Sequence, residues 1–321
     1  MTTRTLTAER PGPVALSVDL PAGDIRVITD PSRTLAEVTV TAHGDDPAVH
    51  DAVRDAVLRW YEPTGNLAVR VNLPAAGVTV VGGQTVIGNR GTTVVQSFGD
   101  IPADVTVTGA VFSGAGIVNV GGGRVTVNGV EITGVGTVLP GGRVEITARV
   151  PEGTSVAAAT RSAPMECAGE FATLDFTSTS GNLTARGVGD LRAKTTSGDI
   201  YAMAVDGIAA AASVSGDIHL GRADNVTAST TSGDVTVNDF AGRAEVASVS
   251  GDVRVHAAEG GTITARSVSG DVTVTATGTA LAEGLTVNAT SRAGRVTTPT
   301  DTPPATAARA RRPRRTNGDA R

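Results

Sequence analysis

The chain has 321 residues, a formal net charge of −5 at pH 7 and 40 glycines, while aromatic side chains make up only 2% of it. So few large side chains exclude a thick globular core and favour a thin one of Val, Ala, Ile and Thr, which is typical of stacked strands. The acidic balance gives no indication of nucleic-acid binding, and the single cysteine, Cys167, excludes an intramolecular disulfide or a metal centre built on cysteines.

Residues 1–13 contain no apolar segment of the kind that a signal peptide requires. Nor does the chain contain a run of about 18 apolar residues that could span a membrane. Both observations favour a cytoplasmic location, with the cell surface as the alternative. Lys194 is the only lysine among 27 basic residues, which indicates a GC-rich bacterial genome.

Residues 1–76 are expected to form β-strands with one short helix. Residues 14–20 and 25–28 alternate apolar and polar side chains on either side of a turn, which predicts a hairpin-like pair. Two further alternating segments, 35–41 and 66–73, predict two more strands.

The helix is predicted over residues 46–61. Asp46 is a suitable N-cap, and Pro47 suits the first helical position. The apolar residues that follow recur at helical spacing and define one face: Val49, Val53, Val57 and Trp60.

Residues 77–142 are rich in glycine, which weakens strands, and they are expected to form an irregular β insertion. Residues 143–150 alternate clearly and lead through a turn into a repeat domain that we place at 143–296. The last segment, 297–321, is rich in proline and arginine and is expected to be disordered. Short β-like patterns also occur within the insertion, at 92–95, 105–107 and 124–127.

The C-terminal half repeats the tripeptide Ser-Gly-Asp at spacings of 17 to 19 residues. A variant with asparagine at residue 182 precedes the five regular copies, and a degenerate copy is expected at 291–295. Such fixed spacing is typical of solenoids, in which each repeat buries its apolar face against its neighbours. The glycines and acids of the five copies are Gly198, Gly216, Gly233, Gly251 and Gly270, and Asp199, Asp217, Asp234, Asp252 and Asp271.

Two columns after each serine are fully apolar and must face the interior. They lie three and five residues after the serine: Leu183, Ile200, Ile218, Val235, Val253 and Val272, then Ala185, Ala202, Leu220, Val237, Val255 and Val274. The column between them is mixed and must face solvent: Thr184, Tyr201, His219, Thr236, Arg254 and Thr273. This alternation is that of a β-strand.

Before each serine, the inward positions are the second and fourth residues back, so the parity changes at the motif. The residues two back are all hydroxylic: Ser178, Thr195, Ser213, Thr230, Ser248 and Ser267. A continuous strand cannot change parity, so a corner is predicted at Ser-Gly-Asp, where glycine is expected to supply a positive φ. The predicted fold is an all-β, single-stranded parallel β-solenoid, right-handed by the crossover rule, with equivalent strands stacked in register.

The five acids of the motif are the strongest candidate site, because stacked carboxylates repel one another unless something compensates them. Calcium does so in some β-rolls, which makes these acids weak calcium candidates. Alternatively, each carboxylate accepts backbone N–H groups of its own turn. We favour this structural interpretation, because Asn182 can perform it and would lose charge in a calcium site.

No catalytic arrangement is recognisable in the sequence, and no cofactor is expected. The hydroxyl column has no neighbouring His or Lys base, and no serine differs from the others. His219 lies on the outward column and is expected to be solvated. Cys167 lies beside Glu166 without a basic partner and is expected to be a small buried residue.

Three features of the chain resemble the DUF4097 family, which is common in high-GC Gram-positive bacteria and whose members are labelled putative adhesins. They are Leu20-Pro21-Ala22-Gly23-Asp24-Ile25, Val150-Pro151-Glu152-Gly153-Thr154, and the run of Ser-Gly-Asp followed by Ile or Val. The resemblance covers roughly residues 14–296 and is strongest over 143–275. It implies a β-solenoid fold and provides no catalytic residues.

The sequence favours a non-enzymatic binding or scaffold protein, adhesin-like in architecture, whose rigid repeat surface meets an unknown protein partner. Tyr201, His219 and Arg254 on the outward column are available to such a partner. Two alternatives stay open: an exported cell-surface adhesin, and a self-assembling structural protein. The ends of a solenoid expose unpaired strands, so we expect a monomer or end-to-end self-association.

Overall fold

The computed structural model describes residues 1–73 and 142–299, together with the backbone of five strands between these ranges. Those strands are β7 (Val86–Asn89), β8 (Thr92–Val95), β9 (Asp104–Val107), β10 (Gly116–Val127) and β11 (Val130–Leu139). β7 pairs antiparallel with β8, while β10 pairs antiparallel with β11 and parallel with β9. The predicted β-like segments are therefore confirmed as strands. The rest of the glycine-rich segment up to residue 141, and residues 300–321 of the tail that was expected to be disordered over 297–321, lie outside the described residues.

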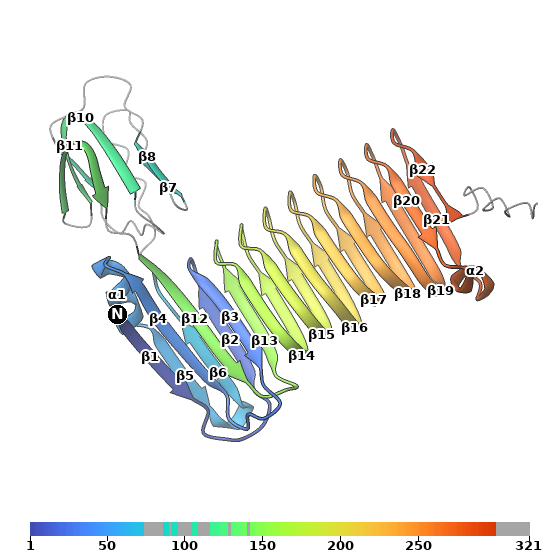
Figure 1. The fold of residues 1–321 in the computed structure, drawn as a ribbon, viewed down its shortest axis with the longest axis horizontal. Helices are drawn as coiled ribbons and strands as arrows, with labels where there is room; N and C mark the ends of the chain where they lie inside the picture. Colours follow the sequence, from blue (N-terminus) through green and yellow to red (C-terminus); the bar gives the residue numbers. More distant parts are fainter. Residues whose placement is uncertain are drawn as a thin grey trace, which may run out of the picture.

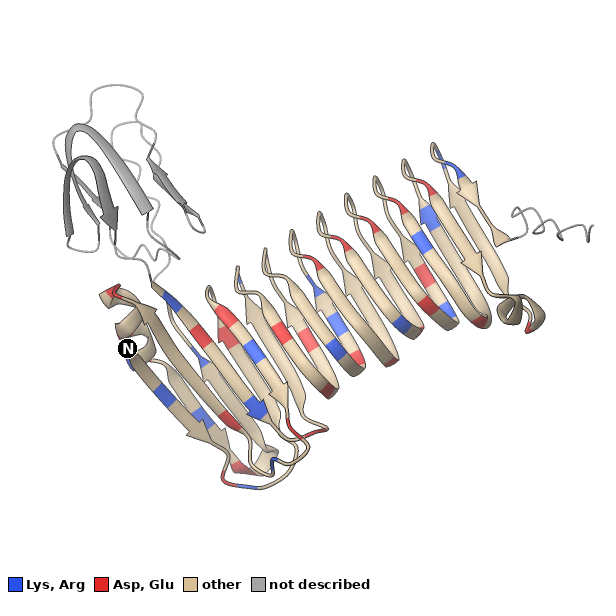
Figure 2. Cartoon of the chain, viewed as in Figure 1, with Lys and Arg blue, Asp and Glu red and all other residues tan. Residues whose placement is uncertain are grey.

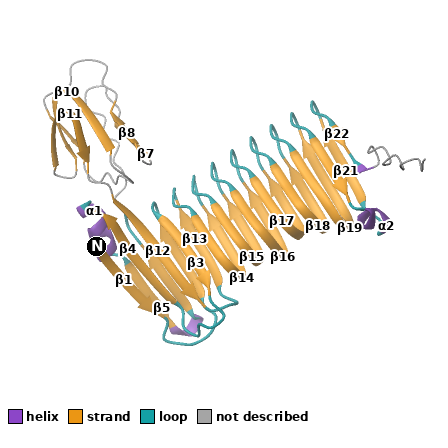
Figure 3. Ribbon diagram, in the orientation of Figure 1, coloured by secondary structure: helices purple, strands orange, loops and turns teal. Residues whose placement is uncertain are grey.

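Seventeen other strands form one elongated β-structure in the described part of the chain (Figure 1). The N-terminal ones are β1 (Thr2–Thr7), β2 (Ala15–Leu20), β3 (Asp24–Thr29), β4 (Glu37–Gly44), β5 (Val57–Tyr61) and β6 (Asn66–Arg70). The later ones are β12 (Gly142–Val150), β13 (Ser155–Thr160), β14 (Met165–Thr177), β15 (Leu183–Lys194), β16 (Ile200–Ala212), β17 (Ile218–Ser229), β18 (Val235–Ala247), β19 (Val253–Ser267), β20 (Val272–Ala276), β21 (Thr286–Ser291) and β22 (Val296–Thr297). Strands dominate the fold, as Figure 3 shows, so the all-β prediction is confirmed.

The strands build two faces that enclose a thin core. The first face runs in the order β1, β4, β12, β3, the first halves of β14 to β19, β20 and β22. The second face runs in the order β5, β6, β2, β13, the second halves of β14 to β19, and β21. Within the repeats the strands are parallel and in register, which confirms the predicted solenoid.

Each turn of the solenoid is one long strand that bends in its middle. In β16, for example, the register shifts between Val205 and Ile208, and the chain passes there from the first face to the second. The Ser-Gly-Asp corner then returns it to the first face of the next turn. Opposite the corner, a bulge within the strand makes the second change of direction.

Residues 14–29 do not form the predicted hairpin. β2 pairs with β6 and β13 on the second face, whereas β3 pairs with β12 and β14 on the first. The turn between them includes Gly23, at φ +130°, and acts as a solenoid corner rather than a hairpin turn. Alternation alone identified the two strands correctly, but it carries no information on which strands pair. The N-terminal segment and the repeat region therefore share one structure.

The predicted helix over 46–61 is too long. Helix α1 covers Pro47–Arg54, with the Asp46 side chain accepting the N–H of Ala48 at 2.9 Å, as predicted for an N-cap. The following residues form β5, antiparallel to β6, because Val57-Leu58-Arg59-Trp60-Tyr61 is rich in β-branched and aromatic side chains. The helical spacing of Val57 and Trp60 was coincidental.

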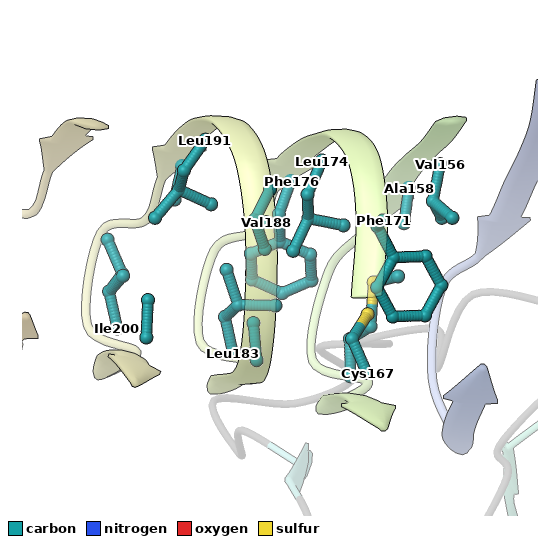
Figure 4. Close-up of a cluster of buried hydrophobic side chains, with 14 of the residues drawn as sticks. Val156, Ala158, Cys167, Phe171, Leu174, Phe176, Leu183, Val188, Leu191 and Ile200 are labelled. Atoms are coloured by element: carbon teal, nitrogen blue, oxygen red, sulfur yellow. The ribbon is translucent and has the colours of Figure 1, made fainter. Parts of the chain in front are cut away.

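The interior is a continuous column of apolar side chains from both faces (Figure 4). The predicted inward columns are buried without exception, which confirms their assignment. A further column lies at the bend and was not predicted: Phe171, Val188, Val205, Ala223, Phe240 and Ala257. Cys167 is buried in this core as predicted, and its burial raises the pKa of its thiol. Helix α1 packs against β1, β4 and β12 at one end, and helix α2 (Gly278–Ala282) against β19 and β20 at the other.

Candidate functional site

The glycines of the Ser-Gly-Asp corners are required by crowding, not by a positive φ. None of them lies in the left-handed region, so the predicted reason for glycine is wrong. Instead, a Cβ atom at Gly233 would overlap the carbonyl oxygen of Gly216 in the preceding turn. The same relation holds along the stack for Gly198, Gly216, Gly251, Gly270 and Gly294. Glycine therefore sets how closely successive corners approach.

The hydroxyl column satisfies backbone groups at these corners, as expected for buried Ser and Thr. In a typical corner, Ser248 accepts the N–H of Gly251 at 2.9 Å and donates to the carbonyl oxygen of Gly233 at 3.0 Å. The predicted degenerate copy is confirmed, because Ser291 bonds Gly294 and Gly270 in the same way. The hydrogen-bonding capacity of these hydroxyl groups is thus used within the fold.

The acids of the motif form a ladder along one edge of the solenoid, visible as red segments at successive corners in Figure 2. Asp217 accepts the N–H of Asp234 at 2.8 Å, and Asp199, Asp234, Asp252 and Asp271 each bond the following corner in the same way. The bond crosses to the next turn, so the predicted bond within each acid's own turn is wrong. Asn182 does the same for Asp199 at 3.1 Å.

One oxygen of each corner acid is thus committed to a backbone N–H, which reduces its capacity to bind a cation. Within the described ranges, no three His, Cys, Asp or Glu side chains are grouped to hold a metal ion.

We therefore propose a structural role for the ladder. Asp217→Asn is expected to shift the free energy of unfolding by less than about 0.5 kcal/mol, since an amide oxygen also accepts a hydrogen bond. Asp217→Ala is expected to cost about 1 kcal/mol. Thermal unfolding with and without calcium checks this: a calcium-dependent rise that Asp217→Asn removes would support the metal site instead.

A hollow lies on the outside of the second face, near its N-terminal end. This trough has a volume of about 630 Å³. Its floor is made by small outward side chains of β6, β2 and β13: Ala68, Ser17, Ala157 and Ala159. Because these neighbours are all small, the surface sinks between the longer side chains on either side.

One wall of the trough is formed by β5, with Val57, Arg59 and Tyr61 projecting outward. Tyr61 is 45% exposed and Val57 36%, so apolar surface is available there. The Tyr61 hydroxyl accepts a hydrogen bond from Arg59 at 3.4 Å, which raises the pKa of the Arg59 guanidinium. This wall therefore combines apolar contact with a fixed positive charge.

The opposite wall is formed by Asp175 and Thr177 of β14. Asp175 lies on the same cross-strand row as Ala157 and Ser17, so it faces Arg59 across the floor. The ion pair of Arg70 with Asp19, at 2.9 Å, lies at one end. The trough thus offers separated charges of opposite sign on either side of a smooth floor.

A second hollow of about 390 Å³ lies on the first face, near the corner at Pro164. Its charged side chains are paired: Arg26 with Glu166 at 3.0 Å, and Arg143 with Asp24 at 3.8 Å. Glu145 contacts His43, which lies outside the hollow, at 2.6 Å. Thr184 of the outward column lines this hollow, and further along that column the rings of Tyr201 and His219 stack 5.0 Å apart. His219 also contacts Asn238 at 2.8 Å, so it is less free than predicted.

The trough was not predicted from the sequence, because the expected helix over 46–61 included Val57 and Tyr61. The small outward residues of the floor could have indicated a hollow in the surface. They come from three segments far apart in the chain, however, so the sequence alone does not show that they are neighbours. Tyr201, His219 and Arg254, the outward residues predicted to be available to a partner, do not line the trough. Arg254 forms ion pairs with the ladder acids Asp234 and Asp252, at 3.1 and 2.6 Å, and so bridges two neighbouring corners.

Comparison with known proteins gives a family and distant structural likenesses. A family model described as Toastrack DUF4097 matches residues 92–321. A putative adhesin from Parabacteroides distasonis ATCC 8503 is 9% identical, with a TM-score of 0.40 over 92% of this chain and 96% of that chain. A putative adhesin from Bacteroides fragilis NCTC 9343 is 11% identical, with a TM-score of 0.39 over 92% and 97%.

A putative lipid binding protein from Parabacteroides distasonis ATCC 8503 is 10% identical, with a TM-score of 0.39 over 92% of this chain and 96% of that chain. At such low identities and TM-scores, these likenesses carry no argument about what the chain binds. No curated protein matches the chain. Among the described helices, none has the length and apolar character needed to cross a membrane.

Proposed function

The chain belongs to the Toastrack DUF4097 family, and we propose that it is a non-enzymatic binding protein whose rigid solenoid presents the trough to a protein partner. The observation that carries the proposal is the trough itself, about 630 Å³ in volume with a floor of small side chains. Preformed hollows with apolar surface and a few placed charges are the usual binding sites of proteins.

The surroundings of the trough support a rigid, preformed site. Its floor strands β6, β2 and β13 are paired on both sides or held in the parallel stack. The inward neighbours of the floor residues, Leu16, Leu67 and Val156, are buried in the core. A partner therefore loses little free energy to ordering of the site, which favours affinity.

The dimensions of the trough suit a protein segment. Its walls are four strand spacings apart, which corresponds to about 19 Å between backbones. The side chains of β5 and β14 narrow this gap, and an α-helix about 10 Å in diameter fits between them. Arg59 on one wall and Asp175 on the other favour a segment with complementary charges on its two sides.

Filling the trough is the test. Ala157→Trp places a large side chain on the exposed floor without disturbing the core, and is expected to weaken partner binding at least about tenfold. The matched control is Thr264→Trp, on the same cross-strand row of the second face but outside the trough. A partner retained from lysate is purified, and its affinity for each variant is measured by titration calorimetry.

Three results would contradict the proposal: no protein retained by the unchanged chain, equal loss with both tryptophan variants, or no loss with Ala157→Trp. Circular dichroism establishes that both variants keep the fold. Because both substituted positions face solvent, no large change in stability is expected for either.

A further inference from the structure

Turn β16 differs from its neighbours in having apolar side chains at its outward positions. We call these residues the apolar band: Tyr201, Met203, Ile208, Ala210, Ala212 and Val214 of the following corner. Four of them are large and exposed: Tyr201 by 39%, Met203 by 52%, Ile208 by 53% and Val214 by 47%. The charged outward residue of this turn, Asp206, is paired with Arg222.

The neighbouring turns are polar at the equivalent positions. In β15 these are Thr184, Arg186, Asp190, Arg192, Lys194 and Thr196, and in β17 they are His219, Gly221, Asn225, Thr227, Ser229 and Thr231. Isolated exposed apolar residues are normal on protein surfaces, but a contiguous set marks an interaction site. The band is therefore a local feature of one turn and not a property of the repeat.

The band passes around the solenoid instead of lying on one side. Tyr201 and Met203 project from the first face, Ile208 lies at the bend, Ala210 and Ala212 lie on the second face, and Val214 is at the corner. A flat lipid surface can contact only one of these sides. A protein segment that follows the turn can contact several of them.

Three cations lie beside the band on β15. Arg192 is in register with Ala210 and Lys194 with Ala212, while Arg186 lies between residues in register with Ala202 and Ala204. The same flank carries one acid, Asp190, which accepts the N–H of Ile208 at 2.8 Å and leaves the flank net positive. In the part of the chain that the structure describes, none of the three cationic side chains forms a hydrogen bond or ion pair. Arg222 on the other side of the band, in contrast, is neutralised by Asp206 at 2.5 Å. The band therefore has free positive charge on one flank only.

We propose that the apolar band binds a segment of a partner protein that carries apolar side chains over the band and carboxylates toward β15. Apolar burial supplies the affinity, and the one-sided charge fixes the direction in which the segment lies. This inference rests on the proposed function only in taking the partner to be a protein. It concerns a different surface from the trough.

The probe is a synthetic, fluorescently labelled peptide of alternating Glu and Leu, with alternating Lys and Leu as its counterpart. Fluorescence anisotropy is expected to detect binding of the acidic peptide and not of the basic one. Arg192→Glu combined with Lys194→Glu, and Met203→Ser combined with Ile208→Ser, are each expected to weaken that binding at least about tenfold.

Matched controls lie elsewhere on the same molecule. Arg243→Glu with Arg266→Glu reverses two cations on the second face away from the band, and Val249→Ser with Val268→Ser removes exposed apolar side chains of similar exposure. Both controls are expected to bind as the unchanged chain does. The inference is overturned if the control variants lose as much affinity for the acidic peptide as the band variants do. It is also overturned if both band variants still bind that peptide as the unchanged chain does.

Two further outcomes separate this inference from its alternatives. Vesicles containing anionic phosphatidylglycerol are expected not to bind, and vesicle binding without peptide binding would assign the band to a membrane and overturn the proposal. Ala157→Trp is expected to leave peptide binding unchanged. If the acidic peptide fails to bind while the trough retains its partner, the inference fails and the proposed function stands.

Discussion

Replacing Gly233 by Ala is expected to lower the free energy of unfolding by about 3 kcal/mol, at the upper end of what overpacking usually costs. The added methyl group would overlap the carbonyl oxygen of Gly216, and that carbonyl belongs to a corner fixed on both sides by its neighbours. Relief requires the stacked turns to separate, which strains the bonds of the Asp217 ladder as well. Urea unfolding followed by circular dichroism measures the loss.

Two companion variants distinguish crowding from a requirement for positive φ. Gly278→Ala adds the same methyl group where no atom lies within 4 Å, and is expected to be neutral or stabilising by up to about 1 kcal/mol. Gly233→Asn is expected to be at least as harmful as Gly233→Ala, because asparagine tolerates positive φ but is larger. An asparagine variant as stable as the unchanged chain would show that crowding is not the cause.

Replacing Phe240 by Ala is expected to destabilise the chain by about 4 kcal/mol. Phe240 is fully buried at the bend, and its neighbours in the column are Ala223 and Ala257. Its ring therefore fills space that the small residues above and below leave open. Truncation would place three alanines in succession and create a cavity that the paired strands cannot close.

A swap tests whether the volume of the column, and not the identity of one residue, matters. Ala223→Phe combined with Phe240→Ala moves the ring by one turn and is expected to recover part of the loss. Phe240→Leu, which keeps most of the volume, is expected to cost only about 1.5 kcal/mol. If the single Phe240→Ala variant unfolds at the same urea concentration as the unchanged chain, the bend is not part of the cooperative core.

The repeat region was predictable from sequence because every turn repeats the same pattern of apolar and polar positions around the Ser-Gly-Asp motif. Six copies of the apolar columns at Leu183 and Ala185 leave little doubt about which side faces in, and all of them are buried. The parity change located the corners correctly. What the pattern could not provide was the reason for glycine, because the overlap of Gly233 with Gly216 exists only once the turns are stacked.

The N-terminal segment was harder to predict because each of its elements occurs once. Val57 and Trp60 fit a helix by spacing, and only pairing of β5 with β6 makes them a strand. The trough depends on that pairing, since Tyr61 and Arg59 form its wall and Ala157 its floor. A site assembled from three segments far apart in the chain has no local signature.

The most direct test of the proposed binding function uses a photo-reactive amino acid at position 157, on the trough floor, and at position 264 as the control on the same face, away from both the trough and the apolar band. Irradiation of cells that produce each variant is expected to join one protein to the chain from position 157 and none from position 264. Cross-linking of the same proteins from both positions, or of none from position 157, would contradict a specific partner in the trough.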